Sequence, residues 1–335
     1  MIFEVIEVAS TSRRSQYFDN AKFMLIFLVV FGHVISPLKE KDNLLNTLYT
    51  FIFLFHMPAF IMISGYFAKG YRKKGYFIKS IKKILIPYVI FQIIYSLFYF
   101  LSGESTSLYI NFFQPHWTLW FLMSLFCWNI FLYLFARLGW YGFFLAVALG
   151  VGIGYIDNIG SFLSLSRTFV FFPYFLFGFL LQKEQFKNII QNKFSLPIGI
   201  LILIVTVLIF TMGLPKDPTA WLLGDTSYAG MGEKQITDGF IRAFQYAATL
   251  IVVFGFLSLI PKNEYKVTKI GQRTLYVYLF HGFIIKTVET IVPDKMLGNF
   301  SSHYLLLICF SLLICFFLGS FLIKKYTRPL VELRL

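Results

Sequence analysis

Charged residues are scarce in this chain of 335 residues. Asp, Glu, Lys and Arg together account for 14% of the sequence, whereas 58% of it is hydrophobic. A soluble domain carries roughly 25% charged residues, so this composition excludes an ordinary soluble fold. Apolar runs of about 20 residues, each long enough to cross a bilayer, recur along the chain. The composition therefore predicts an all-α fold, a polytopic bundle of transmembrane helices.

Cysteine and the motifs of several common enzyme classes are also rare or absent. The three cysteines, Cys127, Cys309 and Cys315, lie inside apolar runs, which indicates small buried side chains and not disulfides or a metal site. The sequence contains no GxSxG elbow, P-loop or HExxH pair, and we expect no metal. Residues 1–16 hold no long apolar segment and no small-residue cleavage site, so we expect no cleavable signal peptide.

Hydropathy predicts about ten membrane spans. They are residues 17–37, 46–68, 82–102, 117–136, 139–156, 168–182, 195–213, 242–260, 274–292 and 302–323. We expect them to form one integral membrane domain over residues 1–335, without an appended soluble domain. The longest connection, residues 213–240, is rich in Gly, Pro and Asp, and this fits a loop that covers a site and a plain connector equally well.

The charges between these spans alternate along the chain. Lys and Arg gather in every second connection, most densely in "KGYRKKGYFIKSIKK" at residues 69–83, and the other connections hold most of the acids. Because Lys and Arg favour the cytoplasmic side, the alternation predicts an even number of spans with both termini in the cytoplasm. The net charge of +14 then reflects membrane orientation, and nucleic acid is not an expected partner.

The first predicted span carries three ionisable residues, Asp19, Lys22 and His33. A charge at the bilayer centre costs roughly 2.5–3.5 kcal/mol on insertion scales, so such residues need a reason. Asp19 and Lys22 are close enough in sequence to pair on a helix. Lys22 and His33 lie about three turns and roughly 16 Å apart on the same face. Taken alone, Lys22 could extend its ammonium to the membrane surface, and His33 could be a hydrogen-bonded packing residue. Their alignment on one helix face favours a functional polar stripe.

Further candidates lie in other predicted spans. They are His56, His116, Trp120, Arg167 and His281. Histidine changes its protonation near neutral pH, which suits base and proton-relay roles. Trp120 and Arg167 fit an interfacial anchor as well as a polar binding site.

Five segments carry a resemblance to a known family. They are "YFDNAKFMLIFLVVFGH", "FHMPAFIMISGYF", "HWTLWFL", "FFPYFLFGFLL" and "GQRTLYVYLFHGF". Their order and context resemble the acyltransferase-3 family of integral membrane acyltransferases, in its fucose 4-O-acetylase-like branch. The family motif is a basic residue, ten intervening residues and a histidine. Lys22 and His33 match it, although most members have Arg at the first position.

The resemblance implies transfer of an acetyl or other acyl group from cytoplasmic acetyl-CoA to a hydroxyl of a cell-envelope glycan or lipid-linked sugar. It implies catalysis by His33 with Lys22 and Asp19, as a general base or as a covalent acyl carrier. The donor phosphates would dock at Lys22 and at the cluster of Arg72, Lys73 and Lys74. The acceptor would meet His56, His116, Trp120, Arg167 and His281.

The same resemblance implies a multi-pass protein of the bacterial cytoplasmic membrane, in contact with lipids and possible envelope-assembly proteins. Two other functions fit intramembrane ionisable residues. One is a glycan or lipid transporter or flippase, although no inverted repeat is visible. The other is a non-catalytic scaffold for envelope assembly.

Overall fold

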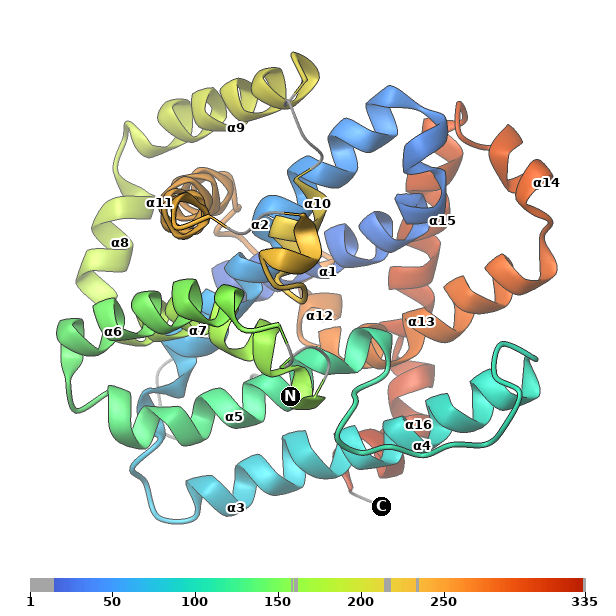
Figure 1. Cartoon of the computed structure of the whole chain (residues 1–335), viewed down its shortest axis with the longest axis horizontal. Helices are drawn as coiled ribbons and strands as arrows, with labels where there is room; N and C mark the ends of the chain where they lie inside the picture. The colour runs from blue at the N-terminus through green and yellow to red at the C-terminus, as the bar shows by residue number, and fades with distance from the viewer. Residues whose placement is uncertain (1–14, 158, 160–161, 214–217, 233–234, 334–335) are drawn as a thin grey trace.

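The computed structural model describes residues 15–157, 159, 162–213, 218–232 and 235–333. Every regular element in these ranges is a helix, so the predicted all-α class is confirmed (Figure 1). The expectation that residues 1–16 are not a cleavable signal falls almost wholly outside the described residues.

The helices follow one another along the chain with short connections. They are α1 (Gln16–Ile35), η1 (Ser36–Lys41), α2 (Asn43–Phe67), η2 (Ala68–Gly70), α3 (Tyr76–Ser80), η3 (Ile81–Leu85), α4 (Ile86–Leu101), η4 (Trp117–Leu119), α5 (Trp120–Phe135), α6 (Gly139–Gly152), η5 (Ile153–Tyr155), η6 (Phe162–Ser164), α7 (Leu165–Leu180), α8 (Lys183–Gln191), α9 (Ser195–Thr211), α10 (Thr219–Leu223), η7 (Ala229–Met231), α11 (Thr237–Ser258), α12 (Thr268–Gly271), α13 (Thr274–Ile291), α14 (Asp294–Asn299), α15 (Tyr304–Leu318) and α16 (Phe321–Glu332).

Each of the ten predicted spans overlaps one of these helices. Six helical segments in the described part of the chain are long and apolar enough to cross a membrane, and eight if each of two bent pairs is one span. The bent pairs are α8 with α9, at 72°, and α15 with α16, at 63°. The chain is thus a multi-pass helical membrane protein, while the count of about ten spans stays a prediction.

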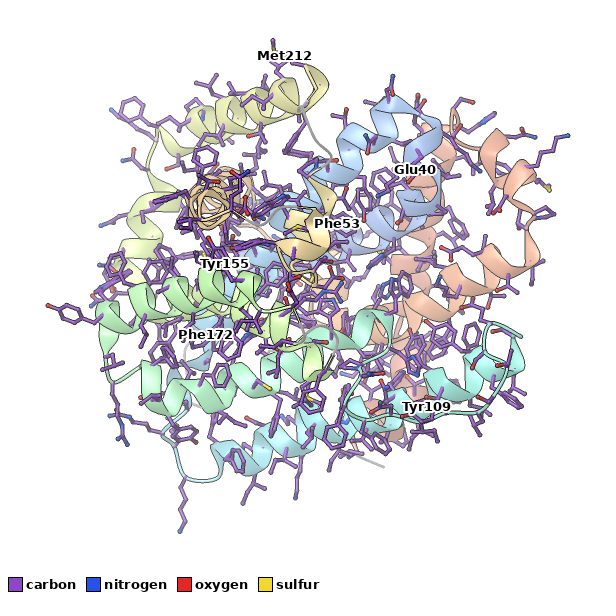
Figure 2. All side chains as sticks on the ribbon, viewed as in Figure 1. Glu40, Phe53, Tyr109, Tyr155, Phe172 and Met212 are labelled. Atoms are coloured by element: carbon purple, nitrogen blue, oxygen red, sulfur yellow. The ribbon has the colours of Figure 1, made fainter. Side chains whose placement is uncertain are left out.

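Helices α1 and α2 run through the middle of the bundle, with α13 to α15 on one side and α6, α8 and α9 on the other (Figure 1). Many outer positions are apolar, such as Phe244 and Leu305, which are 74% and 75% exposed. Met212 projects from the end of α9, whereas Phe53 points into the interior (Figure 2). An apolar exterior suits a helical bundle in lipid.

The contact between α2 and α7 depends on two glycines. A Cβ on Gly65 would lie 1.8 Å from the carbonyl oxygen of Phe175, and one on Gly178 would lie 1.9 Å from that of Met62. Small residues let two helix backbones approach this closely. Gly65 and Gly178 therefore hold α2 and α7 in backbone contact.

The cysteines are free, and only one of them is fully buried. Cys315 is buried and Cys127 is half-buried, but Cys309 is exposed on α15. The prediction of a buried side chain is therefore wrong for Cys309. Hydropathy does not distinguish the lipid-facing side of a span from its protein-facing side, because both are apolar.

Candidate active site

A cavity of about 250 Å³, here called the central chamber, lies where α1, α2, α5, α7 and α13 meet. Its walls are Val29, His33, Ser36, Tyr49, Phe53, His56, Met57, Trp117, Thr118, Trp120, Arg167, Phe171, Leu222, Leu223 and Tyr278. The structure thus brings together four predicted site residues, His33, His56, Trp120 and Arg167. They come from four different helices.

The His33 ring lies among other rings at one wall of the chamber. Its centroid is 4.5 Å from that of Trp117, in an edge-on arrangement, and 5.9 Å from that of Phe53. The His281 ring stacks with His33 at 5.5 Å, although His281 itself does not line the chamber. These rings restrict the orientation of His33, as a reacting side chain requires.

Backbone contacts fix the tautomers of His56 and His281. The Nδ1 atom of His56 lies 2.7 Å from the carbonyl oxygen of Ile52, and that of His281 lies 2.7 Å from the carbonyl oxygen of Tyr278. A carbonyl oxygen can only accept, so each Nδ1 donates and each Nε2 is an acceptor. The Nε2 of His281 is buried without a hydrogen-bond partner in the described part of the chain. In their neutral forms, His56 and His281 therefore each carry one acceptor nitrogen.

Lys22 and Asp19 form the pair that their spacing predicts. The Lys22 Nζ atom lies 2.5 Å from an Asp19 carboxylate oxygen, and the residues are only 3% and 2% exposed. Gln272 next to α12 donates a hydrogen bond of 3.2 Å to the same carboxylate. The ammonium is thus inside the protein, and the snorkelling interpretation of Lys22 is wrong.

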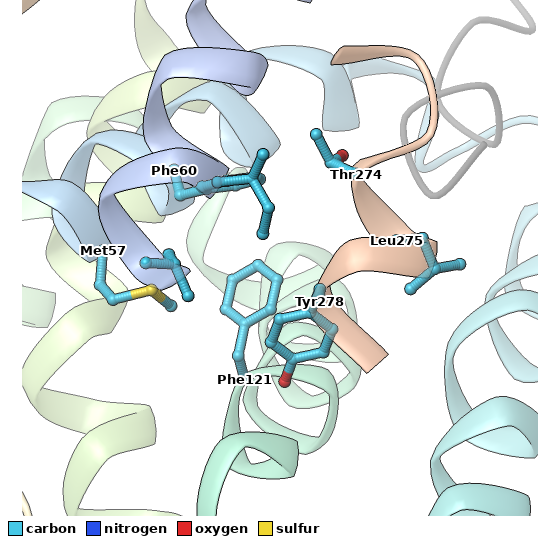
Figure 3. Close-up of a pocket in the computed structure, with 8 residues that line it drawn as sticks. Met57, Phe60, Phe121, Thr274, Leu275 and Tyr278 are labelled. Atoms are coloured by element: carbon cyan, nitrogen blue, oxygen red, sulfur yellow. The ribbon is translucent and has the colours of Figure 1, made fainter. Parts of the chain in front are cut away.

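A smaller cavity of about 20 Å³ adjoins the chamber on the side of α1 nearer Lys22, and Figure 3 shows Phe60, Phe121 and Tyr278 around it. Its walls are Ile26, Val29, Met57, Phe60, Phe121, Thr274, Leu275 and Tyr278, of which Val29, Met57 and Tyr278 also line the chamber. Ile26 stands one helical turn after Lys22. The Phe121 ring lies edge-on to Tyr278 at 5.8 Å and to Phe60 at 6.1 Å. The two cavities therefore adjoin, and the smaller one extends along α1 to within one helical turn of Lys22.

Arg167 holds an outer segment against the chamber. Its guanidinium pairs with Asp225, donates to the carbonyl oxygen of Leu223 at 3.2 Å, and stacks over the Trp120 ring at 5.2 Å. Ser166 donates to the carbonyl oxygen of Gly224 at 2.9 Å. Since Leu222 and Leu223 line the chamber, the described part of connection 213–240 covers the site and is not a plain connector.

His116 does not reach the chamber. Its Nε2 atom lies 2.8 Å from the Ser96 hydroxyl of α4, its ring packs on Tyr99 at 5.1 Å, and its backbone N–H donates to the Gln92 side chain at 3.0 Å. Burial lowers the pKa of His116 below its ordinary value. Its contacts are those of a residue that joins α4 to the start of η4.

Arg72, Lys73 and Lys74 are exposed in the turn between η2 and α3. They follow the end of α2, where the rings of Tyr66 and Phe67 pack on Phe18 at 5.1 and 4.8 Å. Phe18 stands four residues before Lys22 on α1. The basic turn and Lys22 therefore lie at the same end of the bundle.

Sequence reasoning missed Asp225 as the partner of Arg167, and it did not single out Trp117. Tyr278, which lines both cavities, was not singled out. No local pattern points to these residues, because their partners are far away in sequence. Among the described residues, no three His, Cys, Asp or Glu side chains gather in a group that could hold a metal ion.

Comparison with known proteins supplies the family. A family model described as an acyltransferase domain, acyltransferase-3, matches residues 15–320. Nodulation protein NolL of Sinorhizobium fredii is 26% identical over 302 residues, which cover 84% of this chain and 81% of NolL. NolL of Mesorhizobium japonicum is 40% identical over 65 residues, 18% of this chain and 17% of that protein. No solved structure matches significantly. The chain belongs to the acyltransferase-3 family and is a membrane acyltransferase.

Proposed function

We propose that the protein is an O-acetyltransferase of the bacterial cytoplasmic membrane, with both termini in the cytoplasm. It would move an acetyl group from cytoplasmic acetyl-CoA to a hydroxyl of an envelope or exported glycan. The observation that carries this proposal is the position of His33. It faces a chamber with aromatic and cationic walls, and a smaller apolar cavity adjoins that chamber on the side of α1 nearer Lys22.

The donor enters from the end of the bundle that holds Lys22. Acetyl-CoA is a polyanion that lipid excludes, so its phosphates require cations at the membrane edge. Arg72, Lys73 and Lys74 are exposed and supply such cations. A pantetheine arm that follows α1 past Ile26 and Val29 must displace the apolar side chains there, because the cavity has only about 20 Å³, and its thioester then arrives beside His33.

The ammonium of Lys22 forms an ion pair with the Asp19 carboxylate, one helical turn before the small cavity. A lysine binds phosphate as a point charge and lacks the two-pronged geometry of arginine. We assign Lys22 and Asp19 the role of holding the start of the donor path, with Lys22 available to a phosphate that competes with Asp19.

The reaction at His33 can follow two routes with the same balance. In the first, the imidazole takes the proton of the acceptor hydroxyl, the hydroxyl oxygen attacks the thioester carbonyl, and the C–S bond breaks. His33 then returns the proton to the departing thiolate of CoA. In the second, the imidazole attacks the thioester and expels the CoA thiolate. The sugar hydroxyl then attacks the acetyl-His33 intermediate, the bond between nitrogen and the acetyl carbon breaks, and the proton of the hydroxyl passes through the freed imidazole to the thiolate. Detection of acetyl-His33 after quenching distinguishes the two.

The acceptor occupies the outer part of the chamber. The indoles of Trp117 and Trp120 offer flat apolar surfaces to a sugar ring, and Arg167 and His56 offer a donor and an acceptor to its hydroxyls. The resemblance to the fucose 4-O-acetylase-like branch supports a sugar hydroxyl as the acceptor.

The direct test is acetyl-CoA turnover by the purified protein and by a His33→Ala variant. We expect the variant to insert and fold but to lose turnover by at least about 100-fold, since a positioned general base contributes 10²–10⁴-fold. Glycan acetylation in cells, measured by mass spectrometry, should disappear as well.

His303→Ala is the matched control, because His303 is exposed and lies outside the chamber. It should retain full turnover. Unchanged turnover in His33→Ala would remove His33 from the chemistry. Glycan export without any acetyl-CoA turnover by the wild-type protein would favour a transporter instead.

A further inference from the structure

A second large cavity, of about 230 Å³, lies beside the central chamber, and we call it the lateral groove. Its walls are Val34, Pro37, Leu38, Ile285, Val288, Glu289, Val292, Leu297, Phe300, Leu306, Leu307 and Phe310. They come from the end of α1, η1, the second half of α13, the α14 region and α15. All of them except Glu289 are apolar, so the groove suits a hydrocarbon chain and not a sugar.

The groove and the chamber share a wall. His33 and Ser36 line the chamber, whereas Val34, Pro37 and Leu38, which alternate with them in sequence, line the groove. One side of the α1–η1 junction therefore faces the chamber and the other side faces the groove. His33, which lines the chamber, directly precedes Val34, which lines the groove.

Helix α13 connects the two compartments in the same way. Tyr278 lines the chamber, and Ile285 and Glu289 line the groove one turn apart. Tyr278 and Ile285 are separated by roughly 10 Å along the helix axis. One extended molecule could therefore have its polar end in the chamber and its apolar end in the groove.

Two lysines stand at aromatic walls of the chamber. Lys39 Nζ lies 4.5 Å from the ring centre of Tyr49, and Lys286 Nζ lies 5.2 Å from that of Trp117. Lys286 also pairs at 2.7 Å with Glu289, whose side chain lines the groove. The pair is only partly buried, each side chain being 25% exposed, so an anion can compete for Lys286.

We propose that the lateral groove holds the hydrocarbon tail of a lipid-linked sugar acceptor, whose phosphate lies beside Lys286 and whose sugar enters the chamber. This inference rests on the proposed acetyl transfer and specifies its acceptor. Within lipid, an apolar groove has no hydrophobic preference for one tail over another. Selection therefore comes from the phosphate and the sugar, and the groove sets the register of the tail.

The test is photolabelling in phosphatidylcholine nanodiscs with hexadecyl phosphate that carries a diazirine in its chain. We expect saturable labelling of the α13 and α15 segments that line the groove, with excess unlabelled hexadecyl phosphate as the competitor. Ile285→Trp fills the groove and should lower this labelling at least five-fold. Lys286→Gln should weaken competition by the phosphate.

Leu313→Trp is the matched control, because Leu313 is 63% exposed on α15 but does not line the groove. It should leave the labelling unchanged. Val288→Trp is a second groove variant, used if Ile285→Trp fails to run as a folded monodisperse species. The proposal would be overturned if unlabelled hexadecyl phosphate did not compete and the groove variants were labelled as strongly as the wild-type protein. Labelling would then follow only the lipid content of the disc, and bulk lipid would fill the groove.

The labelling does not depend on catalysis. The proposed lipid site and the proposed acetyl transfer can therefore be disproved separately. Absence of acetyl-CoA turnover by the wild-type protein would overturn the acetyltransferase and leave a lipid site. Turnover together with unselective labelling would keep the enzyme and remove the lipid-linked acceptor.

Discussion

The ammonium of Lys22 is 2.5 Å from the Asp19 carboxylate, and burial makes each of these charges depend on the other. Desolvating a charge in a protein costs several kcal/mol, so a buried pair tolerates the loss of both members better than the loss of one. The spacing of the two residues was enough to predict their pairing. Their depth was not predictable, since it depends on Gln272 and on the approach of α12, more than 250 residues later.

This dependence gives a prediction at the residue scale. Asp19→Asn should lower the free energy of unfolding by about 3–5 kcal/mol, because it leaves the Lys22 charge buried without its carboxylate partner. Thermal unfolding in detergent, followed by loss of the monodisperse species, measures the change. The double variant Asp19→Asn with Lys22→Met removes both charges and should recover most of the stability.

Lys22→Arg introduces the residue that the family resemblance predicts at this position and should stay folded and active. A double variant no more stable than Asp19→Asn alone would show that the pair is not the reason for the loss. A fully stable Asp19→Asn variant would contradict the argument from burial.

At the scale of elements, the crossing of α2 and α7 positions much of the chamber. His56 lies on α2 and Arg167 on α7, and the two helices meet where Gly65 faces Phe175 and Gly178 faces Met62. The order of the helices could be predicted from hydropathy, because each span is a long apolar run. Which helices touch could not, since small residues occur on many faces and only the structure pairs them.

We expect Gly65→Ala and Gly178→Ala to separate α2 from α7, because each new Cβ would overlap a backbone carbonyl oxygen. Both variants should be less stable by about 1–3 kcal/mol, the cost of overpacking, and should lose acetyl-CoA turnover as His56 and Arg167 move apart. Thermal unfolding and turnover of the purified variants measure the two effects.

Gly152→Ala is the control for these substitutions. A Cβ there meets no atom within 4 Å, and the residue lies in α6. Alanine should leave turnover unchanged and add about 0.5–1 kcal/mol of helix stability. Equal behaviour of all three alanine variants would rule out steric control of the α2–α7 crossing.

At the scale of the whole molecule, the chamber combines residues that no sequence window contains. His33, His56 and Arg167 could each be singled out as polar residues in apolar spans, and the structure places all three around one cavity. The segment that covers it could not be found in this way. Its attachment through Arg167 and Asp225 joins residues 58 positions apart, and nothing in their local sequence indicates a partner.

The orientation of the bundle remains a prediction, and cysteine labelling can test it. In a variant whose three cysteines are replaced by alanine, Lys73→Cys should resist a membrane-impermeant maleimide in intact cells and react after lysis. Glu40→Cys, exposed in η1 near the opposite end of α1, should react in intact cells. Leu313→Cys, on the lipid-facing side of α15, should not react in either state. The reverse pattern would place the termini outside.

The small apolar cavity lined by Phe60, Phe121 and Tyr278 has a consequence for the cell's energy supply if acyl groups cross the membrane as proposed. A protein that carries an acyl group between two aqueous compartments risks conducting protons and ions along the same route. Narrow hydrophobic constrictions exclude water and so block ion conduction. Because the cavity has only about 20 Å³ of free space, we expect these rings to block water and ions along the proposed donor route while no donor is bound, and so to preserve the membrane potential.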